Sequence, residues 1–256
     1  MPLPNRRYLD LVVYRAYADL RGEAERTYAG YLWWVIDPVV NMAVYYVVFA
    51  FFLDRGREDF APFLLIGLVT WRWFQTAVRI ASASILGGAG LMRQVYLPKI
   101  VLPTSDVVNL TLRFLFAFAL LLPFLWIYGF PVTLSYLALP ILMVVELLLI
   151  LAVVYPLAAL VPLLPDLRKV VDNGLTLLFF LSGIFYAGAS LPERVRPYFY
   201  LNPVVHLIEG YRTVLMEGRW PAPLPLVAVV VGSLIGVAVG SALLSRWDRL
   251  YPRLAN

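Results

Sequence analysis

The chain has 256 residues, of which 62% are hydrophobic and 14% are charged, and its mean hydropathy is +0.80. Soluble domains usually contain about half apolar and about a quarter charged residues, so a soluble core of this size could not bury so much apolar side chain. The sequence has no cysteine and one histidine, His206, which excludes a disulfide framework, a thiolate metal site and a multi-histidine metal cluster. The net charge of +5 comes from arginines that flank apolar segments, and these suit anionic lipid headgroups better than nucleic acid.

Residues 5–28 have the pattern of an amphipathic helix. Arginines are interspersed among apolar side chains at helical spacing, namely Leu9, Val12, Val13, Ala16 and Leu20. Such a helix can lie in the membrane interface with its arginines at the phosphates, although an ordinary juxtamembrane helix shows the same pattern. No early apolar stretch indicates a cleavable signal peptide. We predict a cytoplasmic interface helix over residues 1–30 and a single transmembrane domain over residues 31–256.

Six apolar segments of roughly 20 residues each follow, which is the length that crosses a bilayer. They cover about residues 31–53, 60–86, 104–128, 136–160, 170–188 and 224–244. Polar or turn-forming residues separate them, such as the run from Asp54 to Asp59 and the turn at Gly129. The sequence therefore predicts an all-α membrane protein with six transmembrane helices.

Residues 191–216, between the last two segments, are helical in pattern but too short and too charged to cross a membrane. Asn202 and Pro203 divide them into two halves. We predict a pair of re-entrant half-helices that enter the membrane and return to the same side, because protein can surround such irregular backbone. An exposed surface hairpin is the alternative.

The distribution of Lys and Arg predicts the orientation, because cytoplasmic loops carry the excess. With the N-terminus inside, twelve of them lie on the cytoplasmic side: Arg6, Arg7, Arg15, Arg21, Arg26, Arg93, Lys99, Arg168, Lys169, Arg246, Arg249 and Arg253. Six lie on the other side: Arg55, Arg57, Arg194, Arg196, Arg212 and Arg219. We therefore expect both termini in the cytoplasm.

Sequence signatures of enzymes are absent. There is no GxxxxGK[ST] phosphate loop, no GxSxG turn and no HExxH pair. His206 and Glu209 are three residues apart, but one histidine and one carboxylate make a poor metal site. We predict that this chain is not an enzyme and has no metal or cofactor of its own, so that a partner must supply energy for any transport.

Charged residues inside the predicted spans are costly and usually face a bundle interior or a cavity. Arg72 and Arg79 are seven residues apart and share one helix face, although Arg79 could instead extend to the interface. Arg113 and Glu146 each lie roughly 14–15 Å from an end of neighbouring helices, near the middle of the bilayer. We predict that Arg113 and Glu146 form an intramembrane pair.

Aromatic residues make up 15% of the chain, and several lie too deep for an interfacial belt. The C–H faces of sugar rings stack on aromatic faces, and stacking of this weakly directional kind holds a polymer without trapping it, at roughly 1–3 kcal/mol per contact by analogy with nucleic-acid bases. The aromatics that we expect to line a substrate channel are Tyr45, Phe49, Phe52, Trp71, Phe74, Phe180, Phe185 and Tyr186. Phe179 lies beside them, and packing inside the bundle is the alternative for any one ring.

The segment between the second and third spans has the pattern of a short amphipathic helix that Pro98 ends. Its apolar side comprises Leu91, Met92, Val95 and Tyr96, and its polar residues are Arg93, Gln94 and Lys99. A helix of this kind can insert into a cleft on a partner protein. A passive loop at the membrane interface is the alternative.

Six segments together resemble the membrane subunit of type-2 ABC exporters for lipid-linked polysaccharides, a family that includes O-antigen, teichoic-acid and capsule permeases. They are ERTYAGYLWWVIDPV (Glu25 to Val39), FLLIGLVTWRWF (Phe63 to Phe74), LMRQVYLPKIVLP (Leu91 to Pro103), PDLRKV near Pro165, LSGIFYAGASLP near Leu181 and NPVVHLIEGYR (Asn202 to Arg212). The resemblance covers nearly the full length in the same order. One departure is Ala29-Gly30-Tyr31, where the family usually has Leu-Gly.

The resemblance implies a homodimer of this subunit with two copies of a separate ABC ATPase chain, which binds ATP and Mg. It implies ATP-driven export of undecaprenyl-linked polysaccharide across the bacterial inner membrane, through a channel at the dimer interface. It also implies an ATPase-coupling helix made of Leu91, Met92, Arg93, Gln94, Val95, Tyr96, Leu97, Pro98 and Lys99. The alternatives are a type-2 exporter of a drug or small lipid and a membrane-embedded polyprenyl-lipid transferase, for which no DxD pair is present.

Overall fold

The computed structural model describes residues 59–88 and 97–248 without a break, and ten further residues: 12, 36, 39, 40, 44, 47, 90, 92, 250 and 251. Every regular element within them is helical, which confirms the predicted all-α class. The predicted interface helix and the predicted first span lie almost wholly outside the described residues. Tyr45, Phe49 and Phe52 also lie outside them.

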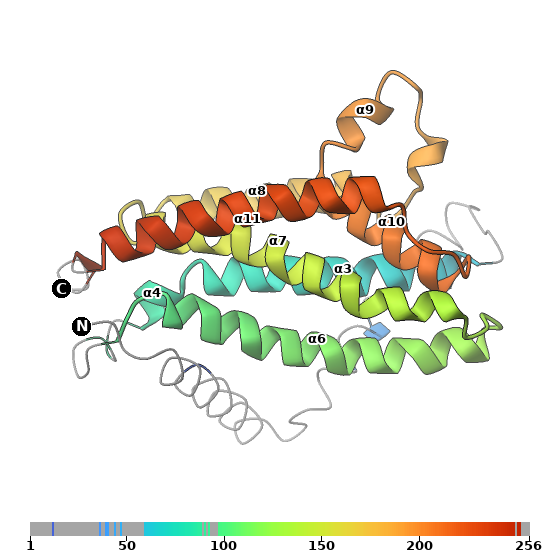
Figure 1. The fold of residues 1–256 in the computed structure, drawn as a ribbon, viewed down its shortest axis with the longest axis horizontal. Coiled ribbons are helices and arrows are strands. Elements are labelled where there is room, and N and C mark those ends of the chain that lie inside the picture. The colour runs from blue at the N-terminus through green and yellow to red at the C-terminus, as the bar shows by residue number, and fades with distance from the viewer. Residues whose placement is uncertain are drawn as a thin grey trace.

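Six longer helices form a bundle in the described part of the chain. They are α3 (Phe60–Ala81), α6 (Val101–Ile127), α7 (Leu139–Leu160), α8 (Leu167–Leu181), α10 (Pro203–Leu215) and α11 (Pro223–Arg246). The short connecting elements are α4 (Ser84–Gly87), η3 (Leu134–Ala138), η4 (Gly188–Ser190) and α9 (Arg196–Phe199). The long helices run side by side, and α9 stands away from the bundle (Figure 1). At the end marked by α4, here called the α4 end, α3 and α11 end and α6 and α8 begin (Figure 1); the opposite end is called the α10 end.

Three of the described helical segments are long and apolar enough to cross a membrane: Val101–Ile127, Leu134–Leu160 and Pro223–Arg246. Large apolar side chains are exposed along them, as Leu120, Val144 and Ile235 illustrate. Exposed apolar side chains are costly in water but not in lipid. These three segments therefore have the surfaces expected of membrane-crossing helices.

The second and fifth predicted spans need corrected boundaries. α3 has 22 residues, about 33 Å, and ends before residue 86 because Ser82 begins a turn. α8 begins at Leu167 and has 15 residues, about 22 Å, so it is shorter than the predicted segment over residues 170–188. The chain turns after α8 because Gly183 has a φ of 69°, a left-handed conformation that favours glycine.

α3 lies at the centre of the bundle, where it contacts α6, α7, α8 and α10. Its Leu64, Ile66 and Trp71 side chains are buried. Trp73 stacks on Phe114 of α6 with ring centroids 4.1 Å apart, a favourable aromatic geometry. Because α3 packs against four other helices, only the part of its surface that these helices leave uncovered can border a cavity.

α7 and α11 pack closely because α11 has small residues where the two helices meet. A Cβ atom added to Gly236 would lie 2.8 Å from the Ala152 Cβ, and one added to Gly240 would lie 2.5 Å from the Pro156 Cδ. Small residues four positions apart commonly allow such close approach between membrane helices. Proline cannot donate a backbone hydrogen bond, so the Ala152 carbonyl that faces Gly236 lacks its usual helical donor.

Gly240→Ala is expected to lower the free energy of unfolding by about 1–3 kcal/mol, because the added methyl group overpacks this contact. Gly232→Ala is the matched control on the same helix, since a Cβ at Gly232 has no atom within 4 Å. The control should be neutral or gain about 0.5–1 kcal/mol from helix propensity. Thermal or denaturant unfolding of the purified variants measures both, and equal stability of the two would contradict the close contact.

Candidate functional site

A cavity of about 450 Å³ lies between α3 and α8. Its α3 lining recurs at helical spacing and so belongs largely to one face: Leu68, Val69, Trp71, Arg72, Gln75, Thr76 and Arg79. α8 contributes Thr176, Phe179 and Phe180. Hydroxyl, amide and guanidinium groups therefore border the same space as aromatic rings, which is the combination that binds carbohydrate hydroxyl groups and C–H faces together.

Phe179, which the sequence groups with Phe180, Phe185 and Tyr186 in the predicted fifth span, is at the centre of an aromatic cluster beside this cavity. Its ring centroid lies 6.0 Å from Trp71, 5.1 Å from Phe180 and 5.2 Å from Phe185. Trp71 also contacts Phe74 at 5.6 Å. Four of the predicted channel aromatics, Trp71, Phe74, Phe180 and Phe185, therefore belong to one cluster around Phe179.

The rings of this cluster differ in what they can contact. Trp71 and Phe74 are only 1% and 4% exposed. Trp71 lines this cavity, whereas Phe74 packs behind Trp71 and lines a separate apolar hollow. Phe180 is 56% exposed and presents a free face. Tyr186 lines that hollow, which has a volume of about 660 Å³ and lies between α7, α8 and the α9 segment. Its ring contacts Phe199 at 5.7 Å, and its hydroxyl donates to the Phe180 carbonyl at 2.8 Å.

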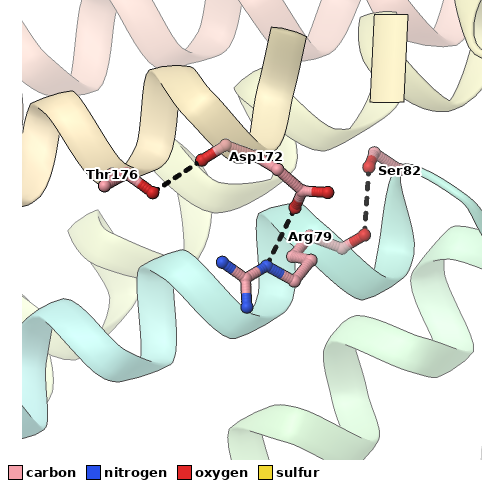
Figure 2. A network of polar contacts seen from close by, with 4 residues as sticks. All are labelled: Arg79, Ser82, Asp172 and Thr176. Carbon is pink, nitrogen blue, oxygen red and sulfur yellow. Dashed lines mark hydrogen bonds and ion pairs between the residues drawn. The ribbon is translucent and has the colours of Figure 1, made fainter. Parts of the chain in front are cut away.

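An ion pair joins α3 to α8 at the α4 end of the cavity. Arg79 Nε lies 3.0 Å from Asp172 Oδ1 (Figure 2). The Thr176 hydroxyl donates to the main-chain oxygen of Asp172 at 2.9 Å, and the Ser82 hydroxyl donates to that of Arg79 at 3.2 Å. The sequence interpretation missed Asp172. Its position just inside the predicted fifth span was a usable signal, because a charged side chain inside a span usually pairs with an opposite charge.

The predicted pair between Arg113 and Glu146 does not form. Arg113 Nε donates to Asn109 Oδ1 at 2.9 Å on its own helix, and neither Glu146 oxygen has a hydrogen-bond partner among the described residues. The Glu146 carboxyl lies near the Tyr211 hydroxyl of α10, outside hydrogen-bonding geometry. The prediction was wrong because equal depth fixes the height of two residues but not their rotation about the helix axes.

Arg212 of α10 is a buried connection between three parts of the chain, whereas the sequence interpretation counted it only as one of the cations on the side opposite the termini. It is 5% exposed. Its Nη1 donates to the Gly183 carbonyl at 2.8 Å, and its Nη2 donates to the Ile184 carbonyl at 2.9 Å and the Phe63 carbonyl at 3.1 Å. The guanidinium carbon lies 3.4 Å from the centroid of the Phe63 ring, a cation–π contact.

A glycine makes room for this arginine. A Cβ atom at Gly67 would lie 2.7 Å from Arg212 Nη2, and hydrogen bonds hold the guanidinium in place. Arginine suits the position because its planar fork of donors reaches several carbonyls at once. The segment NPVVHLIEGYR, which ends at Arg212, was recognised in the sequence. The burial of the Arg212 side chain depends on how α10 packs and could not be read from that segment.

A second polar hollow, of about 550 Å³, lies at the α10 end. Glu209 Oε1 borders it and accepts hydrogen bonds from the Tyr200 hydroxyl at 3.1 Å and the Gly188 amide at 3.3 Å. Burial and the Glu209 carboxylate raise the pKa of Tyr200, so this phenol stays protonated and keeps donating. His206 stacks on Tyr200, with ring centroids 5.5 Å apart, so His206 and Glu209 both have partners within the fold.

The predicted coupling segment is described at Met92 and from Leu97 to Lys99. Met92 and Leu97 are each 7% exposed, so part of its apolar side packs within this chain. Lys99 was expected to stay at the polar surface but is 2% exposed, with its amide donating to Asp248 Oδ1 at 3.0 Å and its Nζ donating to the Leu97 carbonyl at 2.7 Å. The remaining coupling residues, 91 and 93–96, lie outside the described residues.

Comparison with known proteins gives a consistent result over most of the chain. Residues 23–216 match the family described as ABC-2 type transporter. The chain is 30% identical to the O-antigen export system permease protein RfbA of Myxococcus xanthus, over 90% of this chain and 89% of that protein. It is 26% identical to RfbA of Klebsiella pneumoniae, over 94% and 95% of the two chains. It is 28% identical to the polysialic acid transport protein KpsM of Escherichia coli, over 84% of each.

Arg212→Met is expected to lower the melting temperature of the purified protein by about 5–10 °C. Methionine keeps the length of the side chain but leaves the buried Gly183 and Ile184 carbonyls without their donor, at about 1–3 kcal/mol for each. The matched control is Arg219→Met at the same end, where Arg219 is exposed and contacts Glu217 at the surface. A melting temperature of the Arg212 variant equal to that of the control would refute the connecting role.

Proposed function

The chain belongs to the ABC-2 type transporter family, and from that premise we propose that it is the membrane subunit of an ATP-driven polysaccharide exporter. Its cargo is an undecaprenyl-linked polysaccharide of the O-antigen kind, which moves across the bacterial inner membrane. Relatives named as O-antigen export permeases and as a polysialic acid transport protein match nearly the whole chain. Because these matches extend over nearly the whole chain, they support the same class of cargo here.

The observation that carries the proposal is the cavity between α3 and α8. The Gln75 amide and the Thr76 and Thr176 hydroxyls can hydrogen-bond to sugar hydroxyl groups, and Phe180 offers a face for stacking. Small-molecule pockets are lined mainly by apolar and aromatic side chains, whereas this cavity also presents two guanidinium groups, an amide and two hydroxyls. We assign this cavity to the sugar path, with Trp71, Phe74, Phe179 and Phe185 as its support.

The proposed architecture has six membrane spans in one domain over residues 31–256, after an interface helix over residues 1–30. Within the described residues, the proposed spans are α3, α6, η3 with α7, α8 with the turn after it, and α11, and the proposed first span lies within residues 31–53. With the buried Lys99 and Arg212 set aside, eleven cationic residues remain on the proposed cytoplasmic side against five on the other. This charge difference favours both termini and the α4 end in the cytoplasm.

We propose that residues 191–216 form the re-entrant pair. α10 has 13 residues, about 20 Å, which is too short to cross the bilayer. Its Val205, Ile208 and Tyr211 side chains are buried against the other helices, as re-entrant backbone requires. The Asn202 side chain accepts a hydrogen bond from the Val204 amide and so caps α10 where the two halves meet.

Two copies of this subunit are proposed to assemble with two copies of an ABC ATPase chain, which holds the ATP and Mg, while this chain holds no cofactor. The coupling helix over residues 91–99 is proposed to dock on that ATPase. The C-terminal end of this segment is held at the α4 end by the hydrogen bond from the Lys99 amide to Asp248. This anchoring supports transmission of ATPase movements to α6, which begins two residues later.

The proposed function is tested in inside-out membrane vesicles that contain this chain and its proposed ABC ATPase partner. We expect ATP-dependent uptake of undecaprenyl-linked O-polysaccharide, no ATP hydrolysis by the purified chain alone, and hydrolysis once the ATPase is added. Uptake of a cationic dye in place of the polysaccharide would instead identify a drug exporter. Glycosyl transfer by the purified chain would identify a transferase.

Phe180→Leu is expected to slow the initial rate of polysaccharide uptake about threefold to tenfold in these vesicles, because leucine keeps apolar bulk but loses the stacking face. Trp126→Leu is the matched control, since Trp126 is a similarly exposed aromatic on α6 outside the cavity lining. Uptake is normalised to the amount of inserted protein. Wild-type rates in both variants would remove Phe180 from the sugar path.

A further inference from the structure

The ion pair between Arg79 and Asp172 lies where the cavity meets the α4 end. Arg79 is in the last turn of α3, and Asp172 is near the start of α8. Arg72 and Arg79 both line the cavity, whereas no carboxylate is among its described lining residues. Two guanidinium groups therefore border the cavity, and Asp172 is the acidic residue described at its end.

This ion pair can be exchanged at low cost. The two side chains are 48% and 43% exposed, and exposed pairs contribute little because water screens them. Only the Nε edge of Arg79 faces the carboxylate, and its two terminal nitrogens point away from it (Figure 2). Among the described residues, no hydrogen bond holds these nitrogens, and the buried Asp172 Oδ1 atom makes no contact of this kind besides the ion pair itself. An arriving anion can therefore replace Asp172 without breaking another contact.

We propose that Arg79 binds the diphosphate group of a polyprenyl-linked glycan, with Arg72 as a second ligand further into the cavity, and that Asp172 pairs with Arg79 when no diphosphate is bound. The inference rests on the proposed function, which supplies the lipid-linked class of cargo. A guanidinium suits this ligand because its planar donors match phosphate oxygens in a bidentate manner. A diphosphate also offers more acceptor oxygens and more negative charge than the carboxylate that it displaces.

The depth of the two arginines fits this ligand. The α4 end is the proposed cytoplasmic end, and the last turn of α3 places Arg79 at the level where lipid headgroups lie. Arg72 is two helical turns away on the same face, about 10 Å along the axis. Gln75 and Thr76, which lie between the two arginines along α3, and Phe180 of α8 border the same space and offer contacts to the diphosphate and its first sugars. An ordinary phospholipid headgroup has no glycan to make these contacts.

The test measures binding of undecaprenyl diphosphate to the purified full chain in detergent by native mass spectrometry, with undecaprenol and phosphatidylglycerol as comparison lipids. Wild-type protein is expected to bind the diphosphate more tightly than both. Arg79→Gln should weaken that binding at least about tenfold, which corresponds to a lost charge-assisted hydrogen bond. Asp172→Asn should strengthen it about twofold to fivefold, because the competing carboxylate is gone.

Opposite effects of the two variants distinguish a binding site from a structural contact. An ion pair that only stabilised the fold would be broken equally by both substitutions, so shifts in the same direction would overturn the proposal. Arg168→Gln is the matched control, since Arg168 is an exposed arginine in the first turn of α8 outside the cavity lining. Equal losses in Arg168→Gln and Arg79→Gln, or equal binding of phosphatidylglycerol, would also overturn it in favour of general attraction to anionic headgroups.

Thermal unfolding of each variant shows whether it is folded. If Arg79→Gln does not fold, Arg79→Lys replaces it, and lysine should still weaken binding because it keeps the charge but loses the planar donors. The binding assay needs no ATPase. Weak diphosphate binding together with normal ATP-dependent export would therefore refute this site alone, and tight binding without export would refute the proposed function alone.

Discussion

The buried guanidinium of Arg212 is the contact on which the arrangement of the α10 end depends. Through three carbonyl oxygens it joins the first turn of α3, the turn after α8 and α10, segments that lie up to 149 residues apart in sequence. A buried charge is tolerated only when its donors are satisfied, so these segments cannot separate without exposing the cation to an apolar surrounding. Because α3 and α8 are fixed to each other at this end, their spacing determines the cavity that lies between them.

The two ends of the cavity are held in different ways. At the α10 end, Arg212 is buried and makes several hydrogen bonds with fixed backbone groups. At the α4 end, the half-exposed Arg79 makes one contact with a side chain that can rotate away. The strong connection therefore lies on the proposed outer side and the exchangeable one on the proposed cytoplasmic side. This asymmetry suits a path that cargo enters from the cytoplasm.

The sequence was sufficient to predict what depends on local pattern. Apolar length predicted the all-α class and the helices around Phe114, Leu149 and Val229, and the aromatic positions predicted most of the cluster around Phe179. The failures concern contacts between helices. The depth of Arg113 and Glu146 could be counted along the chain, but the rotation of α6 and α7 depends on packing across the whole bundle. The burial of Arg212 and Lys99 likewise depends on segments far away in sequence, and charge alone suggested the opposite.

The close contact between α7 and α11 has a mechanical consequence. Where Gly236 and Gly240 approach Ala152 and Pro156, the backbones leave no free volume for the helices to slide or tilt against each other. Two helices joined in this way are expected to move as one rigid body. The flexibility that a passing polymer needs is then expected at the boundary between α3 and α8, where a cavity lies beside the few contacts that join the helices. α7 and α11 are thus expected to stay fixed relative to each other while the space between α3 and α8 widens.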